Sequence, residues 1–232
     1  MNPNILLVED DPVSRAFLEA ATAALPARVA VAADAASARA LANAATFDLW
    51  LFDANLPDAT GAELLAHLRG TGFDTPALAH TAARDAGVHA ELRAAGFVAV
   101  VAKPVDAASW QAALRRALHE DAGTHVADAA IPGYDERTLW DDAAALAALN
   151  GNAEHVAALR QLFLDELPGM RASIIDAATR GATLHRLRAS CGFVGAARLD
   201  AAVQALQANA SEQALQRALD TLRDTLDQPP SR

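Results

Sequence analysis

The sequence contains a single cysteine, Cys191, so no disulfide can form within the chain. A lone cysteine suits a reducing compartment, and we expect a cytoplasmic protein. Long hydrophobic runs are also missing: the longest early one, Ile5 to Val8, is far too short for a signal peptide or a membrane span. We therefore expect no membrane partner.

Basic residues are scarce relative to acidic ones. Against 29 Asp and Glu the chain has 19 Lys and Arg, which gives a formal net charge of −10 and a pI of about 5.0. A nucleic-acid-binding protein needs a basic face that neutralises phosphates, and no stretch of this sequence provides one. Nucleic acid is therefore not an expected partner.

Spacings of the His-Glu-x-x-His or Cys-x-x-Cys kind, which are typical of metal sites, are absent from the sequence.

The 232 residues are enough for two domains, and the pattern changes along the chain. Up to about residue 120, short apolar runs alternate with helical stretches; the runs are Ile5–Val8, Val29–Ala32, Leu49–Phe52, Ala77–His80 and Val98–Ala102. Such alternation predicts an α/β domain with a five-stranded, doubly wound parallel sheet covered by helices on both faces.

The second part of the chain has a different periodicity. Residues 121–133 contain Gly123, Pro132 and Gly133 without a sustained pattern, which is typical of a linker. From residue 134 to 232 apolar residues recur at helical spacing, and no strand run follows. We predict an all-helical bundle of four or five helices, in which Gly181 ends one helical stretch before the next begins.

Polar side chains follow four of the five predicted strands. Glu9 and Asp10 follow the first, Asp53 the third, Thr81 the fourth and Lys103 the fifth. The carboxyl ends of parallel strands meet at one edge of the sheet, which is where ligands bind in such folds. Converging carboxylates require a cation, and an open site with oxygen ligands favours Mg²⁺. Lysine and hydroxyl groups on the other side would suit phosphoryl oxygens.

These residues, in this order, resemble the response-regulator receiver family, whose fold is flavodoxin-like. The similarity extends over residues 3–120 and rests on the segments Ile5–Asp11 and Asp53–Pro57, on Gly61, on Thr81-Ala82 and on Lys103-Pro104. It implies that Asp53 takes a phosphoryl group from the phosphohistidine of a sensor histidine kinase, while Thr81 and Lys103 contact phosphoryl oxygens. Asp10, Asp53 and the backbone carbonyl of Asn55 would ligate Mg²⁺, and Glu9 would hold the water shell of the metal.

Other readings of single residues follow from local geometry. Asp11, followed by Pro12, suits a helix N-cap rather than a metal ligand. The resemblance implies a cis bond between Lys103 and Pro104. Val100 stands where the family commonly has an aromatic switch residue, and His80, which precedes Thr81 on a strand, is expected to face away from the pocket.

A second candidate site lies in the helical part. Leu184, Leu187, Cys191 and Val194 would point inward, which leaves an outward stripe of His185, Arg188, Ala189 and Gly192. An exposed imidazole beside a cation and small residues would suit the docking of a phosphorylated protein.

The segment from His185 to Leu199 is similar to the histidine-phosphotransfer (HPt) family. The resemblance extends over residues 134–227, with Arg188 in place of the usual lysine and Ala189 in place of the usual glycine. It implies that His185 is a phosphohistidine assisted by Arg188. The segment between Pro168 and His185 is shorter than in the family by more than a helical turn. His185 is therefore expected near the start of its helix, where the positive helix end favours neutral imidazole.

Two hypotheses remain open. In the first, the chain is a phosphorelay protein that exchanges a phosphoryl group with a kinase, another receiver or an HPt protein through Asp53 and His185. In the second, phosphorylation of Asp53 changes how the helical domain binds a partner, and His185 carries no phosphoryl group. The sequence has no Gly-rich ATP-binding elements, so we expect a phosphotransfer protein rather than an enzyme that uses ATP.

Overall fold

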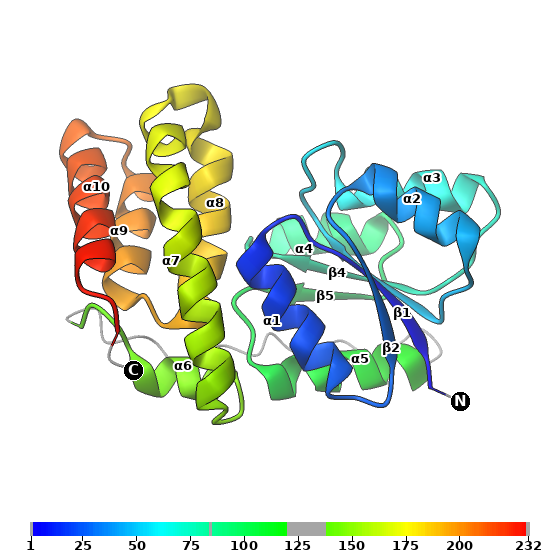
Figure 1. Ribbon diagram of the computed structural model, residues 1–232. Helices are drawn as coiled ribbons and strands as arrows, with labels where there is room; N and C mark the ends of the chain where they lie inside the picture. Colours follow the sequence, from blue (N-terminus) through cyan, green and yellow to red (C-terminus); the bar gives the residue numbers. More distant parts are fainter. Residues whose placement is uncertain (1, 84, 120–137, 231–232) are drawn as a thin grey trace. The chain divides into compact units, whose positions relative to one another are not determined.

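The computed structural model describes residues 2–83, 85–119 and 138–230 (Figure 1). The chain divides into two compact units, residues 1–130 and 131–232. The predicted linker, residues 121–133, lies outside the described residues.

The first unit is the predicted doubly wound sheet. Its strands are β1 (Asn4–Val8), β2 (Arg28–Ala32), β3 (Leu49–Asp53), β4 (Ala77–Thr81) and β5 (Ala99–Ala102). All neighbouring pairs are parallel, in the order β2-β1-β3-β4-β5. The intervening helices are α1 (Pro12–Ala23), α2 (Ala35–Ala44), α3 (Gly61–Gly70), α4 (Ala86–Ala94) and α5 (Ala107–His119). The predicted fold class of this unit is confirmed.

Helices cover both faces of the sheet (Figure 1). On the face of α2, α3 and α4, the core contains Leu6, Phe52, Trp50 and residues of those helices. On the face of α1 and α5, which pack together, Phe17 and Trp110 are fully buried. Strands β3 and β4 are buried along their whole length. Because these strands are buried on both faces, their sequences are continuously apolar and do not alternate between apolar and polar residues.

The second unit is helical throughout its described residues. It contains α6 (Asp142–Ala148), α7 (Ala153–Ile175), α8 (Ala177–Val194), α9 (Ala197–Ala208) and α10 (Glu212–Asp227). Side-chain caps at Asn152, Asp176 and Ser211 begin α7, α8 and α10. No helix within the described ranges combines the length and apolar character needed to cross a membrane.

The boundary between α7 and α8 differs from the prediction. Gly181 was expected between two helices, but it lies inside α8, which begins at Ala177. Asp176 alone separates the helices, because it ends α7 and its side chain caps α8. Arg180 stabilises this tight junction by donating hydrogen bonds to the carbonyl oxygens of Ile174 and Ile175. His185 is therefore the ninth residue of α8 rather than a residue of its first turn.

Helix α6 packs against the C-terminal end of α8. Gly195 ends α8 in the left-handed conformation, with φ of 72°, and its carbonyl accepts a hydrogen bond from the N–H of Asp141. A Cβ atom at Gly195 would overlap the backbone oxygen of Asp141. Glycine is therefore required at this position, both for the conformation and for the close approach of α6.

Candidate functional site

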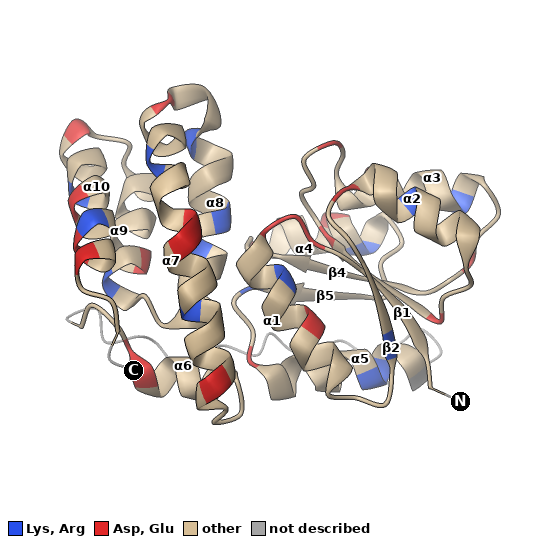
Figure 2. Ribbon diagram, in the orientation of Figure 1, with Lys and Arg blue, Asp and Glu red and all other residues tan. Residues whose placement is uncertain are grey.

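The polar residues selected from the sequence do meet at the carboxyl edge of the sheet. Asp53 and Thr81 are the last residues of β3 and β4, while Glu9 and Lys103 directly follow β1 and β5. The loop between β1 and α1 carries the acidic residues next to this edge (Figure 2). Glu9, Asp53, Thr81 and Lys103 are all buried, with exposed fractions of 0–4%.

Lys103 joins the two buried carboxylates. Its Nζ donates hydrogen bonds to Glu9 Oε2 at 2.9 Å and to Asp53 Oδ2 at 2.5 Å. A charged lysine in such a buried place requires this compensation, since an unpaired buried ammonium is strongly destabilising. The pairing places a cation directly beside the oxygen of Asp53.

Burial and ion pairing shift the pKa values of Asp53, Glu9 and Lys103. Burial alone would raise the pKa of Asp53, but the Lys103 ammonium outweighs it and holds that pKa below its usual value. Burial raises the pKa of Glu9 well above its usual value, and the neighbouring Asp53 charge adds to this effect. The two carboxylates raise the pKa of Lys103 despite its burial. Asp53 is therefore an ionised carboxylate, the nucleophilic form, at neutral pH.

The loop after β3 holds the Asp53 side chain in place. The backbone N–H of Asn55 donates to Asp53 Oδ1 at 2.9 Å, and the N–H of Gly61 donates to the Ala54 carbonyl at 3.0 Å. This closure brings the start of α3 so near that a Cβ atom on Gly61 would overlap the backbone oxygen of Asp53. Gly61 is thus required for the position of the carboxylate.

We expect Gly61→Ala to destabilise the chain by about 1–3 kcal/mol, because the added methyl group collides with backbone that cannot turn aside. The matched control is Gly70→Ala at the other end of α3, where an added Cβ meets nothing within 4 Å. Gly70→Ala should be neutral or stabilising, since alanine has the higher helix propensity. Urea unfolding of both variants checks this, and equal stabilities would contradict the close-approach argument.

The remaining predicted receiver residues have the following positions. Thr81 Oγ1 accepts a hydrogen bond from the N–H of Ala83 at 3.1 Å, and the Lys103–Pro104 bond is cis as expected. Asp11 caps α1 by accepting from the N–H of Ser14, which confirms its capping role. Asp10 follows Glu9 in the loop between β1 and α1 and is partly exposed. Val100 is 1% exposed and belongs to the core.

The placement of His80 corrects the sequence prediction. It was expected to face away from the pocket, yet its Nδ1 lies 3.4 Å from Glu9 Oε2 and its side chain is fully buried. The register of the sheet explains this: Asp53 and His80 are partners in the β3–β4 ladder, and level residues on neighbouring strands share a face.

His80 should make the chain sensitive to acid. Burial, and then repulsion from Lys103, lower the pKa of His80 to about 3, whereas an unfolded histidine titrates near 6.5. As the pH falls below about 6.5, the unfolded chain takes up a proton that the folded chain does not. The contribution of His80 to the free energy of unfolding therefore falls on acidification, by about 1.4 kcal/mol per pH unit.

His80→Phe removes this titration and keeps a ring in the core. Between pH 6.5 and 5 the free energy of unfolding of the wild type should fall more steeply than that of the variant. Urea unfolding at a series of pH values measures both slopes. Parallel slopes would show that His80 is protonated in the folded chain as readily as in the unfolded one.

The candidate histidine of the helical unit, His185, lies in the middle of α8; the residue is partly exposed, while its Nε2 atom is buried. Arg188, one turn further on, has 26% of its side chain exposed, and its Nε lies 3.9 Å from Asp200 Oδ1 on α9. The two residues are neighbours at i and i+3 on one helix, as predicted. The helix-end argument for neutral imidazole does not hold, because the dipole effect is confined to the first turn.

The two small residues predicted on the exposed stripe are buried. Ala189 is 1% exposed and Gly192 is also buried. Phe193, one turn further along α8, is fully buried as well. The buried surface of α8 therefore extends beyond the stripe of leucines from which the exposed face was predicted.

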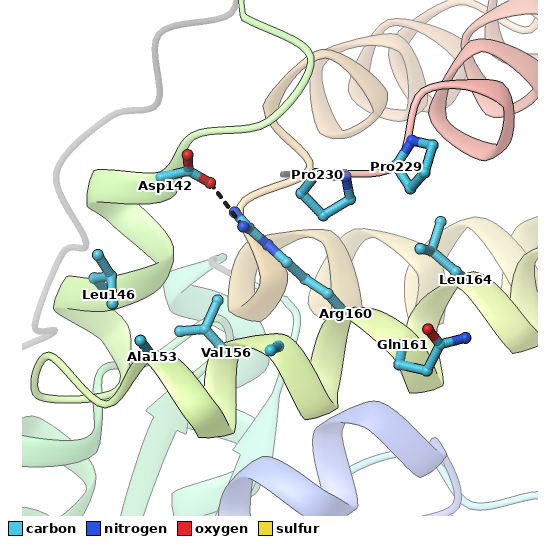
Figure 3. Close-up of a pocket in the computed structure, with 10 residues that line it drawn as sticks. Asp142, Leu146, Ala153, Val156, Arg160, Gln161, Leu164, Pro229 and Pro230 are labelled. Atoms are coloured by element: carbon cyan, nitrogen blue, oxygen red, sulfur yellow. Dashed lines mark hydrogen bonds and ion pairs between the residues drawn. The ribbon is translucent and has the colours of Figure 1, made fainter. Parts of the chain in front are cut away.

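A groove of about 690 Å³ opens elsewhere in the helical unit (Figure 3). Apolar side chains of α6 and α7 line it together with Pro229 and Pro230. At its base Arg160 donates to Asp142 Oδ1 at 2.6 Å and to the Val194 carbonyl at 2.9 Å, which ties α6 and α8 to α7. None of the predicted site residues lines this groove, and we assign Arg160 a structural role.

Known proteins match the chain in the following way. Residues 5–115 match the family model of the response regulator receiver domain. The sensor histidine kinase AruS of Pseudomonas aeruginosa is 31% identical over 212 residues, which cover 89% of this chain and 21% of that protein. The Regulator of RpoS of Escherichia coli K12 is 36% identical over 101 residues, which cover 44% of this chain and 30% of that protein. The chain thus spans less than a third of the length of these curated relatives.

Among solved structures, the chemotaxis response regulator CheY4 of Vibrio cholerae is similar. It is 28% identical, with a TM-score of 0.48, and the match covers 51% of this chain and 100% of that one. The family match, together with the residues at the carboxyl edge of the sheet, confirms the first part of the sequence interpretation. Residues 5–115 form a response regulator receiver domain, the signal-receiving part of a two-component system.

Proposed function

We propose that this chain is a phosphorelay protein in which Asp53 accepts a phosphoryl group from the phosphohistidine of a sensor kinase. The observation that carries the proposal is the hydrogen bond between the Lys103 Nζ and the Asp53 carboxylate, at the carboxyl edge of a receiver sheet. In the transfer, an oxygen of Asp53 forms a bond to phosphorus while the phosphorus–nitrogen bond of the donor breaks. The donor imidazole keeps the electron pair of that bond.

A divalent cation fits the oxygen donors at this edge. The side chains of Asp10 and Asp53 and the backbone carbonyl of Asn55 would hold Mg²⁺, with Glu9 acting on its water shell. Asp10 is partly exposed and Asn55 is exposed, so both can be reached from solvent. When bound, the ion neutralises the charge of the transferring group. Glu9, Asp53 and His80 also offer atoms within 4.8 Å of one another, but Lys103 already lies between those carboxylates.

Lys103 and Thr81 would contact the phosphoryl oxygens. Lys103 already lies within hydrogen-bond distance of Asp53. The backbone N–H of Lys103 also donates a hydrogen bond to the Thr81 carbonyl, which holds these two residues together. A lysine ammonium and a hydroxyl are suitable donors to phosphoryl oxygens. We propose no ATP-dependent kinase activity for the chain, which would receive and pass on phosphoryl groups made elsewhere.

We further propose that His185 relays the phosphoryl group to or from a receiver aspartate, as in the HPt-like pattern of its helix. Three observations support this role. The second unit is a helical bundle in its described residues, His185 is partly exposed in mid-helix, and Arg188 stands one turn away to meet phosphoryl oxygens. The similarity to the sensor histidine kinase covers 89% of this chain and so extends beyond the receiver domain into the helical unit.

The alternative function is a phosphorylation-regulated interaction module. It is favoured by the single-residue connection between α7 and α8, which departs from the HPt pattern, and by the burial of Ala189 and Gly192. In this case Asp53 is phosphorylated, the helical unit binds a partner, and His185 transfers nothing.

Labelling by acetyl phosphate, a small phosphodonor, tests the proposed function. With Mg²⁺ the intact mass should increase by one phosphoryl group, which is lost in mild base as expected of an acyl phosphate. A chelator should prevent the labelling, since the transferring group and its acceptor are both anionic. Labelling that continues at full rate without divalent cations would overturn the metal-assisted mechanism.

A further inference from the structure

The buried imidazole of His80 connects the acidic pocket with helix α5. On one side its Nδ1 lies 3.4 Å from Glu9 Oε2. On the other side its ring meets the ring of Trp110 edge to face, with centroids 5.7 Å apart and an interplanar angle of 79°. Both side chains are fully buried, so a shift of one cannot be absorbed by solvent.

Trp110 in turn connects α5 with α1. Its Nε1 donates a 2.9 Å hydrogen bond to Thr22 Oγ1, and that hydroxyl donates to the Leu18 carbonyl at 2.6 Å. The contacts thus run without a gap from the pocket through two aromatic rings to the α1–α5 face. Among the described elements, α5 is the last one before α6 in the sequence.

The pocket end of this route contains a shared ion pair that phosphorylation of Asp53 would disturb. In the structure the Lys103 ammonium is divided between Glu9 and Asp53. A phosphoryl group on Asp53 adds oxygens and negative charge on one side of that ammonium, which draws Lys103 away from Glu9. His80 Nδ1 already lies 3.4 Å from Glu9 Oε2, at the outer limit of a hydrogen bond, so a small movement would close this contact. His80 can therefore take up the contact that Glu9 loses.

We propose that His80 couples the state of the pocket to helix α5. When Lys103 turns to a phosphoryl group on Asp53, Glu9 and His80 form a hydrogen bond and the imidazole shifts against Trp110. The inference rests on the proposed phosphorylation of Asp53. It also offers a route that does not need an aromatic residue at Val100, whose buried aliphatic side chain cannot act as an aromatic switch.

The three tryptophans of the chain allow a direct test in the full-length protein. With 5-fluorotryptophan they give three ¹⁹F resonances, which Trp110→Phe and Trp140→Phe assign. Acetyl phosphate and Mg²⁺ should shift the Trp110 resonance in proportion to the phosphorylated fraction found by intact mass. The Trp50 resonance should change much less, because Trp50 belongs to the core on the other face of the sheet.

His80→Phe is the decisive variant, since it keeps a ring against Trp110 but has no nitrogen toward Glu9. The Trp110 shift, divided by the phosphorylated fraction, should fall several-fold in this variant. His80→Gln, which keeps a polar group near Glu9 but has no ring, should show the same loss and serves if the Phe variant does not fold. An undiminished shift in either folded variant would overturn the route through His80.

The inference and the proposed function can fail separately. Phosphorylation of the wild type without a change at Trp110 overturns the coupling and leaves the phosphoacceptor role intact. Absence of any phosphoryl group by mass overturns the proposed function, and the coupling with it.

Discussion

Asp53→Asn should lower labelling by acetyl phosphate on the order of 100-fold or more, because the amide cannot act as the nucleophile that forms an acyl phosphate. In the structure the Asp53 carboxylate is kept ionised by Lys103, and asparagine would remove that charge. Quantitative intact-mass measurement in the presence of Mg²⁺ gives the labelled fraction. Circular dichroism and urea unfolding establish that the variant is folded.

The matched control for this variant is Asp74→Asn. Asp74 is an exposed aspartate of the same unit, and it follows α3 at the other end from the acidic pocket. Its labelling should equal that of the wild type. If the folded Asp53→Asn protein is labelled as well as the control, the phosphoryl group resides elsewhere and the assignment of Asp53 is wrong.

His185→Gln should abolish acid-labile, base-stable phosphate on the helical unit, also by about 100-fold or more, when a phosphorylated receiver is supplied. Glutamine is polar and of similar length but has no imidazole nitrogen to bond phosphorus. Labelling of Asp53 by acetyl phosphate should persist in this variant. The measurement is the amount of phosphate that survives base treatment, compared between wild type and variant.

His155→Gln provides the control for the second site. His155 is an exposed histidine near the start of α7, so its replacement should leave the base-stable phosphate unchanged. Arg188→Ala should slow the transfer without unfolding the bundle, since a quarter of its side chain is exposed and its Nε lies as far as 3.9 Å from Asp200 Oδ1. A folded wild type that never acquires base-stable phosphate would favour the interaction-module hypothesis.

Much of the receiver could be predicted because its signals are local. Apolar runs mark the buried strands, Asp11 and Pro12 mark the start of α1, and the residues after the strands meet wherever parallel strands end. The contact between His80 and Glu9 was missed because it depends on the register between strands that are far apart in the sequence. A one-residue difference in register would turn His80 to the other face.

The helical unit was predicted less fully, for a different reason. Its class follows from helical periodicity, but Gly181 does not interrupt the helix as the sequence suggests. A glycine inside a helix costs only about 1 kcal/mol relative to alanine, which the Asp176 cap and the Arg180 hydrogen bonds offset. The burial of Ala189 depends on tertiary packing, which the spacing of leucines does not report.

The central claim is that one chain carries an aspartate and a histidine phosphorylation site, and peptide mapping of the phosphorylated wild type tests it most directly. After treatment with acetyl phosphate and Mg²⁺, a base-labile phosphoryl group should be found on the peptide that contains Asp53. After addition of a phosphorylated receiver, a base-stable group should be found on the peptide that contains His185. Phosphate on neither peptide of a folded protein would contradict the account, and phosphate on the Asp53 peptide alone would reduce the chain to a receiver with a helical interaction module.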